Sequence, residues 1–267
     1  MRANQKPVGE HLREWRMRRR MSQMDLALEA EISTRHLSFV ETGRAQPSRD
    51  MVLHLADQLE IPLRERNVIL VAAGFAPVFP QRPLDDPRLA AARKAVDVIL
   101  KAHEPYPALA VDLRWNLVAA NAVVAPLMAG VDPALLEPPL NVVRLSLHPR
   151  GLGPRIVNLA EWHAHIVERL RRQAELTADP GLIALIEEIR GYPVPPASDR
   201  RLEDYGDVVI PLQLMVGDDL LSLFTTTTVF GTPVDVTLAE LTLETFFPAD
   251  PATAAFLRNA HAAQATV

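Results

Sequence analysis

Two residues that can carry a positive charge, Arg144 and His148, lie four positions apart in an otherwise apolar stretch. The guanidinium group of arginine presents a fork of N–H donors that matches the two oxygens of a carboxylate. The spacing therefore predicts a site for an acidic ligand head group, with Asn121 as an additional donor. The residues leave an alternative open, in which Arg144 pairs with an acidic residue of its own domain and His148 merely precedes Pro149 in a turn.

Apolar residues in the same half of the chain are candidates to line an elongated cavity for such a ligand. Taken singly, the tryptophans among them are typical core residues. The candidates are Trp115, Met128, Leu147, Trp162, Ile166, Phe224 and Phe230.

Glu161, His163 and His165 suggest a metal site at first sight, but their spacing argues against it. Residues two apart on a helix point to different faces, so the two histidines cannot share an ion. Glu161 and His165 alone supply two ligands, fewer than a zinc site needs. The sequence also has no nucleophile elbow, phosphate-binding loop or dinucleotide fingerprint. We therefore expect no metal, no cofactor and no enzymatic activity.

The stretch from Ser22 to Ser48 predicts two short helices joined by a tight turn. Ser22 is a good N-cap, Ser33 opens the second helix, and Gly43 ends it. Two helices in this arrangement have the shape that enters a DNA major groove. The side chains that the second helix would present are Thr34, Arg35, Ser38 and Phe39, and Ser33 at its start is a further candidate DNA contact.

Apolar periodicity predicts three further helices around this pair, so that residues 1–75 form an all-α five-helix bundle. The three are expected at residues 8–20, 50–59 and 63–73. Four prolines within residues 76–87 indicate a linker. A connecting helix is expected at 89–102, before a second domain at 105–267.

The second domain mixes helices with strands. Residues 108–113 and 115–120 read as a hairpin, and three late strands are expected around residues 208–214, 221–225 and 241–245. Helices are expected at 158–176, 180–190 and 251–263, with a short one at 122–128 capped by Asn121; residues 142–147 fit either a strand or a helix. This order predicts an α+β, PAS-like sensor domain with an antiparallel sheet.

The first domain resembles the phage-repressor-like (XRE-type) helix-turn-helix over residues 8–75. The resemblance lies in Gln23, in Glu41-Thr42-Gly43-Arg44 and in Pro47-Ser48. It places Glu41 so that it can pair with Arg16 of the first helix. The turn departs from the family pattern, because Glu31 stands where glycine is usual and would cost about 1 kcal/mol in a left-handed conformation. By this resemblance base edges are contacted by Thr34, Arg35, Ser38 and Phe39, and phosphates by Gln23, Arg44, Ser48 and Arg49.

The second domain resembles the ligand-binding domain of MmyB-like transcription regulators over residues 105–262. The segments that carry the resemblance are 105–121, 141–149, 158–162 and 226–250. In that family a PAS-like domain follows an XRE-type helix-turn-helix and is associated with a buried fatty-acid-like ligand. The resemblance therefore implies a fatty acid or a similar amphiphile as the effector.

Composition and charge agree with two globular domains. The chain has 267 residues, 48% hydrophobic, and a net charge of −5, which divides into +2 for residues 1–66 and −7 for the rest. The basic residues Arg13, Arg16, Arg18, Arg19 and Arg20 cluster at the N-terminal side, as a DNA-contacting or simply solvated helix face. Cysteine is absent, and neither a signal peptide nor an apolar run long enough for a membrane span occurs. We expect a cytoplasmic protein without membrane contact.

Together these features predict a sequence-specific transcription regulator whose DNA binding is modulated by a small apolar ligand, which the resemblance implies is a fatty acid. A single helix-turn-helix contacts one half-site, so a homodimer on a two-fold-related operator in double-stranded DNA is expected. Two alternatives remain: a repressor whose second domain serves only dimerisation or protein contact, and an enzyme fused to a DNA-binding module. A fully packed second domain would favour the first of these alternatives.

Overall fold

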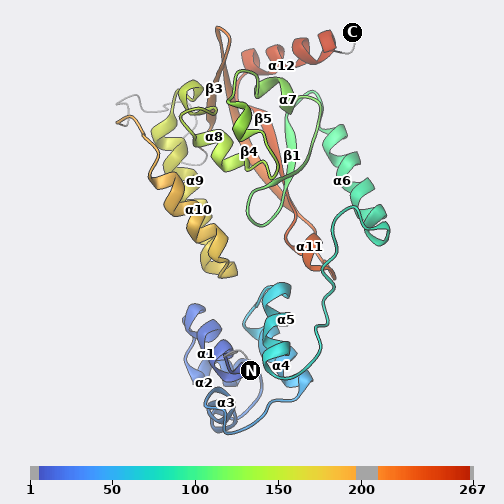
Figure 1. Cartoon of the computed structure of the whole chain (residues 1–267), viewed down its shortest axis with the longest axis vertical. Helices are drawn as coiled ribbons and strands as arrows, with labels where there is room; N and C mark the ends of the chain where they lie inside the picture. Colours follow the sequence, from blue (N-terminus) through green and yellow to red (C-terminus); the bar gives the residue numbers. More distant parts are fainter. Residues whose placement is uncertain (1–5, 197–209, 265–267) are drawn as a thin grey trace. The chain divides into compact units, whose positions relative to one another are not determined.

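A computed structural model describes residues 6–196 and 210–264 of the chain, which forms two compact units. The first unit comprises Met1–Pro83 and Thr232–Ala239, and the second comprises Leu84–Gly231 and Glu240–Val267. The chain therefore passes between the units three times. Figure 1 shows the elements of each unit.

The first unit is the predicted five-helix bundle. Side-chain hydroxyls of Ser22, Ser33 and Ser48 cap three of its helices, and Ser22 forms a capping box with Asp25. The core contains fully buried leucines from the first four helices. The helices are α1 (Val8–Arg18), α2 (Gln23–Glu29), α3 (Thr34–Glu41), α4 (Arg49–Gln58) and α5 (Leu63–Ala72).

The turn between α2 and α3 keeps the left-handed geometry even without glycine. Glu31 has a φ of 53°, and the neighbouring Ile32 N–H donates to the carbonyl of Ala27. The motif thus has its usual turn, and Glu31 carries the conformational cost expected of a residue with a Cβ atom.

The second unit is built on an antiparallel five-stranded sheet with strand order β2-β1-β5-β4-β3. Gly217, with a φ of 62°, forms the turn between β3 and β4. The early hairpin and the three late strands agree with the sequence prediction, although residues 208 and 209 lie outside the described part of the chain. The strands are β1 (Ala108–Val111), β2 (Leu117–Ala120), β3 (Leu212–Val216), β4 (Asp219–Val229) and β5 (Thr242–Pro248).

Helices cover both faces of this sheet, as Figure 1 shows. On one face α8 (Val142–Leu147), α9 (Leu159–Thr177) and α10 (Pro180–Arg190) enclose the main core. On the other face α6 (Ala90–Ala102) packs its Val96 and Leu100 against β1 and β5. The ambiguous stretch 142–147 is therefore a helix, because its apolar residues pack against α9.

Shorter elements complete the second unit. They are α7 (Val124–Leu127), α12 (Pro251–Gln264), which packs on β4 and β5, and the 3-10 helices η1 (Pro87–Leu89), η2 (Pro133–Leu135) and η3 (Gly153–Arg155). The expected capping of α7 by the Asn121 side chain is wrong. That buried amide accepts from the Ala108 N–H and donates to the carbonyls of Leu100 and Tyr106, so it fixes the start of β1.

The segment between β4 and β5 belongs to the first unit and contains a helix that the sequence did not predict, α11 (Val236–Ala239). Three polar contacts fix it to the proline-rich linker. The Val236 N–H donates to the Pro80 carbonyl (2.8 Å), Thr237 Oγ1 donates to the Arg82 carbonyl (2.5 Å), and Arg82 pairs with the buried Asp235 (2.9 Å).

Candidate DNA-binding surface and ligand cavity

The outer side of α3 presents the side chains expected to read DNA. Thr34 and Arg35 are exposed, and Ser38 and Phe39 are half-buried. The guanidinium groups of Arg35 and Arg44 lie over the Phe39 ring, 5.3 and 5.9 Å from its centre. This cation–π arrangement holds two cations beside an apolar ring.

A buried ion pair connects α1 to the end of α3, as the sequence indicated. Arg16 Nε donates to Glu41 Oε1 (2.7 Å) and Arg16 Nη2 to Glu41 Oε2 (2.9 Å). The hydrogen bond that Arg16 donates to Glu41 raises the pKa of Arg16. Gln23 Nε2 also donates to Glu41 Oε2 (2.7 Å), so the amide expected at a phosphate has a protein acceptor. The pair fixes the angle at which α3 leaves the bundle.

Arg16 and Arg19 of the basic N-terminal cluster bond to other parts of the first unit. Arg16 forms the buried pair, and Arg19 donates to the carbonyls of Leu59 and Glu60 at the end of α4 (both 2.8 Å). The cluster is therefore not one uniform DNA-contacting face. The candidate phosphate ligands Arg44, Ser48 and Arg49 are exposed, and Ser48 and Arg49 begin α4.

The second unit contains an apolar cavity of about 110 Å³ between the sheet and α8–α9. A typical ligand pocket has roughly 300–1,000 Å³, so a long aliphatic chain requires this cavity to widen. Four of the sequence candidates line it: Trp115, Met128, Trp162 and Ile166. Other lining residues include Leu109, Leu117, Val124, Leu127, Val142, Val143, Leu145, Ser146, Leu152, Arg169, Leu212, Leu214, Leu223, Thr225, Glu244 and Phe246.

The candidate head-group residues Arg144 and His148 do not line this cavity. Arg144 is paired with Glu188, at 2.7 Å from Nε to Oε1, as in the alternative interpretation. That hydrogen bond lowers the pKa of Glu188 and raises that of Arg144. His148 Nδ1 accepts from the Arg150 N–H, and the imidazole ring packs edge-on against Tyr192.

Four further candidates lie elsewhere in the second unit. Asn121 fixes β1, and Leu147 is buried in the main core without lining the cavity. Phe224 stacks on Phe247, whereas its neighbours Leu223 and Thr225 line the cavity. Strand alternation explains the difference, because successive side chains point to opposite faces. Phe230 packs against the α6 side of the sheet.

The cavity has a polar end that the sequence analysis missed. Arg169 of α9 donates to both carboxylate oxygens of Glu244 of β5, from Nη1 (2.9 Å) and from Nη2 (2.5 Å). Arg169 Nη2 also donates to Thr227 Oγ1 (2.7 Å). The sequence does carry a signal for this pair. Arg169 follows Ile166 by three residues on the apolar side of its helix, and Glu244 is the one charged residue of the strand Thr242–Pro248.

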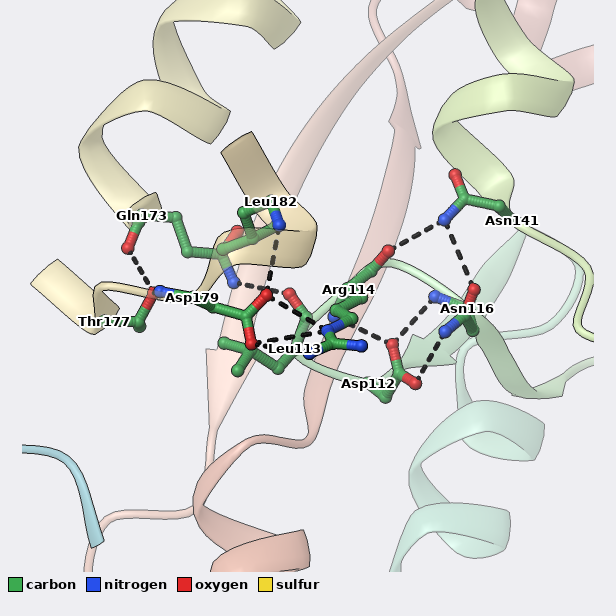
Figure 2. A network of polar contacts seen from close by, with 9 residues as sticks. All are labelled: Asp112, Leu113, Arg114, Asn116, Asn141, Gln173, Thr177, Asp179 and Leu182. Carbon is green, nitrogen blue, oxygen red and sulfur yellow. Dashed lines mark hydrogen bonds and ion pairs between the residues drawn. The ribbon is translucent and has the colours of Figure 1, made fainter. Parts of the chain in front are cut away.

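A polar network holds Trp115 at this end of the cavity. Trp115 has a φ of 66°, its Nε1 donates to Gln173 Oε1 (2.8 Å), and the Arg169 guanidinium lies 4.6 Å from its ring centre. Figure 2 shows how the surrounding loop is fixed to α9 and α10. Arg114 pairs with Asp179, which caps α10, and Gln173 Nε2 donates to the Leu113 carbonyl.

The two histidines on α9 each contact another part of the protein. His163 Nε2 contacts the Ile189 carbonyl (2.9 Å), and His165 stacks on Trp162. Burial, then Arg169 and Arg172, lower the pKa of His165. Among the described residues no group of three His, Cys, Asp or Glu side chains is placed to hold a metal ion.

The first unit has a larger hollow, of about 820 Å³, between α5 and residues 77–81 of the linker. Its lining mixes charged side chains such as Lys6 and Arg64 with exposed apolar ones such as Val68 and Val71. The Asn67 amide closes one side by bonding the backbone of Val78 and Phe79.

The first unit thus contains the helix-turn-helix arrangement that enters a DNA major groove, and the second is a sheet domain with an apolar cavity. Residues 92–260 match the MmyB-like transcription regulator ligand binding domain, so the chain belongs to that family. Residues 7–68 match a helix-turn-helix domain. A comparison with curated proteins found no match. The two domains together are those of a ligand-responsive transcription regulator. In the described part of the chain, no helix has the length and apolarity needed to cross a membrane.

Proposed function

We propose that the protein acts in the cytoplasm and binds a specific operator sequence in DNA. An amphiphile with an aliphatic chain, such as a fatty acid, binds in the cavity of the second unit and modulates this DNA binding. The observation that carries the proposal is that β4 and β5 both line the cavity and are joined by a segment of the first unit. Leu223 and Thr225 of β4, and Glu244 and Phe246 of β5, line the cavity. The segment that joins these two strands, Thr232–Ala239, belongs to the DNA-binding unit.

A ligand in the cavity can therefore affect the DNA-binding unit through β4 and β5. A ligand that widens the cavity by displacing the lining side chains of β4 or β5 acts on strands that both lead into the segment held by Arg82 and Pro80. Regulation requires that the ligand bind the DNA-competent and DNA-incompetent arrangements with different affinity. The cavity itself favours this function over a second domain that serves only dimerisation, because a domain used only for contact needs no lined interior.

The experiment is a linkage measurement on delipidated full-length protein. An operator is first selected from random duplexes, and octanoic acid is then titrated by calorimetry with and without that operator. We expect the ligand to change operator affinity by about 5–150-fold, and the operator to change ligand affinity by the same factor. Identical ligand affinity with and without operator would leave a binding protein that does not switch.

A separate variant tests whether the segment between β4 and β5 couples ligand binding to DNA binding. Thr237→Val removes the hydrogen bond to the Arg82 carbonyl and should reduce the coupling factor while each binding step alone persists. Glu188→Gln, in a surface pair of the second unit, is the control and should leave coupling unchanged. Full coupling in Thr237→Val would contradict this route.

In the groove we propose that Arg35 reads a guanine and Phe39 contacts a thymine methyl, while Arg49 holds a phosphate. Arg35→Ala should cost about 1–3 kcal/mol on the operator and relax preference at one base pair. Arg49→Ala should weaken specific and random DNA alike and flatten the salt dependence. Equal losses on both kinds of DNA for Arg35→Ala would contradict the assignment.

We also propose a homodimer on a two-fold-related operator, since one bundle covers one half-site. Helix α6 exposes Val98 and Ile99, with 58% and 38% of their surfaces accessible, which suits a contact between copies. Sedimentation of the wild type with and without operator, compared with a Val98→Glu variant, tests this. A monomeric wild type in both conditions would exclude the dimer.

A further inference from the structure

We infer that the cavity, through the Arg169–Glu244 pair, selects a ligand whose head group is uncharged and can form hydrogen bonds. An alcohol therefore binds in its ordinary neutral form, whereas a fatty acid binds only when its carboxyl group is protonated. The inference rests on the proposed function, because it concerns the ligand of the same cavity. It changes the expected head-group site from Arg144 and His148 to residues that line the cavity.

Arg169 is a cation whose charge is already neutralised. Its two terminal nitrogens both donate to Glu244, and the Glu244 side chain is only 3% exposed. A ligand carboxylate that took over these donors would leave the Glu244 charge buried without its partner, which is strongly unfavourable. A carboxylate that stayed beside the pair would face a second carboxylate in a poorly hydrated site.

The same pair still offers hydrogen bonds to a neutral head. Nε of Arg169 has no acceptor among the described residues, although the other two nitrogens do. Ser146 Oγ, in the cavity lining, accepts from Trp162 Nε1 (3.0 Å), so its own hydroxyl proton can be donated. Thr225 supplies a further hydroxyl group. A hydroxyl, amide or protonated carboxyl group can accept from these donors without disturbing the ion pair.

No other charged side chain faces the head in this arrangement. Within the lining set, the ionisable groups are Arg169 of α9 and Glu244 of β5. His165, four residues before Arg169, stacks on Trp162, and burial lowers its pKa, so it is neutral above pH 7. Arg172, which also lowers the His165 pKa, is not among the lining residues. Measurements between pH 7 and 9 therefore report the ligand's own proton.

The test compares octanol with octanoic acid on delipidated full-length protein by calorimetry. Because a carboxyl group has a pKa of about 4–5, its protonated fraction falls tenfold per pH unit in this range. We expect the dissociation constant of octanoic acid to rise about tenfold per pH unit, and that of octanol to stay constant. If the protonated acid and the alcohol bind equally well, the alcohol should bind about 1,000- to 10,000-fold more tightly than the acid at pH 8.

The same substitution, glutamate to glutamine, at two different positions makes the test more specific. Glu244→Gln removes the negative charge beside Arg169, so octanoate should then bind as an anion with no pH slope, while octanol affinity changes by less than about threefold. Glu188→Gln makes the same substitution in the Arg144 pair outside the cavity and should behave as wild type. The wild-type pH slope alone decides the question if Glu244→Gln does not fold.

Three results would count against the inference. Octanoate that binds wild type at pH 8 as tightly as octanol does, without a pH slope, would show that the anion is bound. An effect of Glu188→Gln equal to that of Glu244→Gln would place the selection outside the cavity. Failure of both ligands to bind folded wild type would remove the amphiphile of the proposed function itself, and this inference with it.

Discussion

Two arginine–glutamate pairs, one in each unit, have the same chemistry and different surroundings. Arg16 and Glu41 are 10% and 1% exposed at the side chain, and Nε, Nη1 and Nη2 of Arg16 all donate to protein oxygens. The Arg169 side chain is 25% exposed and lines a cavity. Among the described residues, its two terminal nitrogens have acceptors and its Nε has none.

The difference indicates what each pair can do. A charge pair with every nitrogen bound and closely packed neighbours can only fix an arrangement, here the angle between α1 and α3. A pair beside a cavity keeps unused hydrogen-bonding capacity where a ligand can reach it. The DNA-binding unit is therefore expected to be rigid at its centre, and the sheet unit to be adaptable.

The largest effect that tests this comparison is on stability. Glu41→Gln leaves Arg16 buried without a counter-charge and should lower the free energy of unfolding of the first unit by about 3–5 kcal/mol. Glu244→Gln should cost only about 1–2 kcal/mol, because the Arg169 side chain is 25% exposed and its charge is less desolvated than that of Arg16. Chemical denaturation followed by circular dichroism gives both values.

Equal costs for these two variants would show that the surroundings of the pairs do not matter. Glu188→Gln is the reference for a pair whose partners are 36–42% exposed, and should cost less than about 1 kcal/mol.

A smaller effect is expected from two glycines that differ in the same way. A Cβ atom on Gly9 of α1 would lie 2.3 Å from the Val40 carbonyl oxygen at the end of α3, against backbone that cannot move alone. On Gly181 of α10 it would meet the Arg114 side chain, which can turn away. Gly9→Ala should thus lower stability by about 1–3 kcal/mol, and Gly181→Ala by less than about 1 kcal/mol.

These values can be measured by thermal unfolding, with operator binding as a second readout for Gly9→Ala. If Gly9→Ala proved as harmless as Gly181→Ala, the close contact between α1 and α3 would not be a stabilising constraint.

The smallest effect is a pH dependence confined to the sheet unit. The folded pKa of His165 is lowered chiefly by burial, below the ordinary 6.5. His165 therefore binds a proton more readily in the unfolded chain than in the folded chain. As a result, the free energy of unfolding falls as the pH drops through 6.5 toward the folded pKa. His165→Phe, which keeps the stacking on Trp162, should reduce this acid sensitivity by less than about 2 °C in Tm between pH 7 and 6. An unchanged slope would exclude His165 as its source.

The first unit was largely predictable because its signals are local. Helix caps at Ser22, Ser33 and Ser48, apolar spacing and the Arg16–Glu41 pair follow from residues within a few turns or from one resemblance. In the second unit the same reasoning placed the strands and long helices, since their periodicity is also local. It did not reveal α11, a single short turn fixed by distant linker residues.

The sequence by itself determined the two-domain order, the helix-turn-helix and an α+β second domain with apolar faces. Only the tertiary structure decided which residues meet at the cavity. Arg144 and Arg169 look alike as isolated arginines, but Arg144 reaches Glu188 on α10 while Arg169 reaches Glu244 on β5. That outcome depends on the rotation of α9 against the sheet and on the strand register that pairs Thr227 with Glu244. Both are set by packing between residues far apart in the chain, for which no local pattern carries a signal.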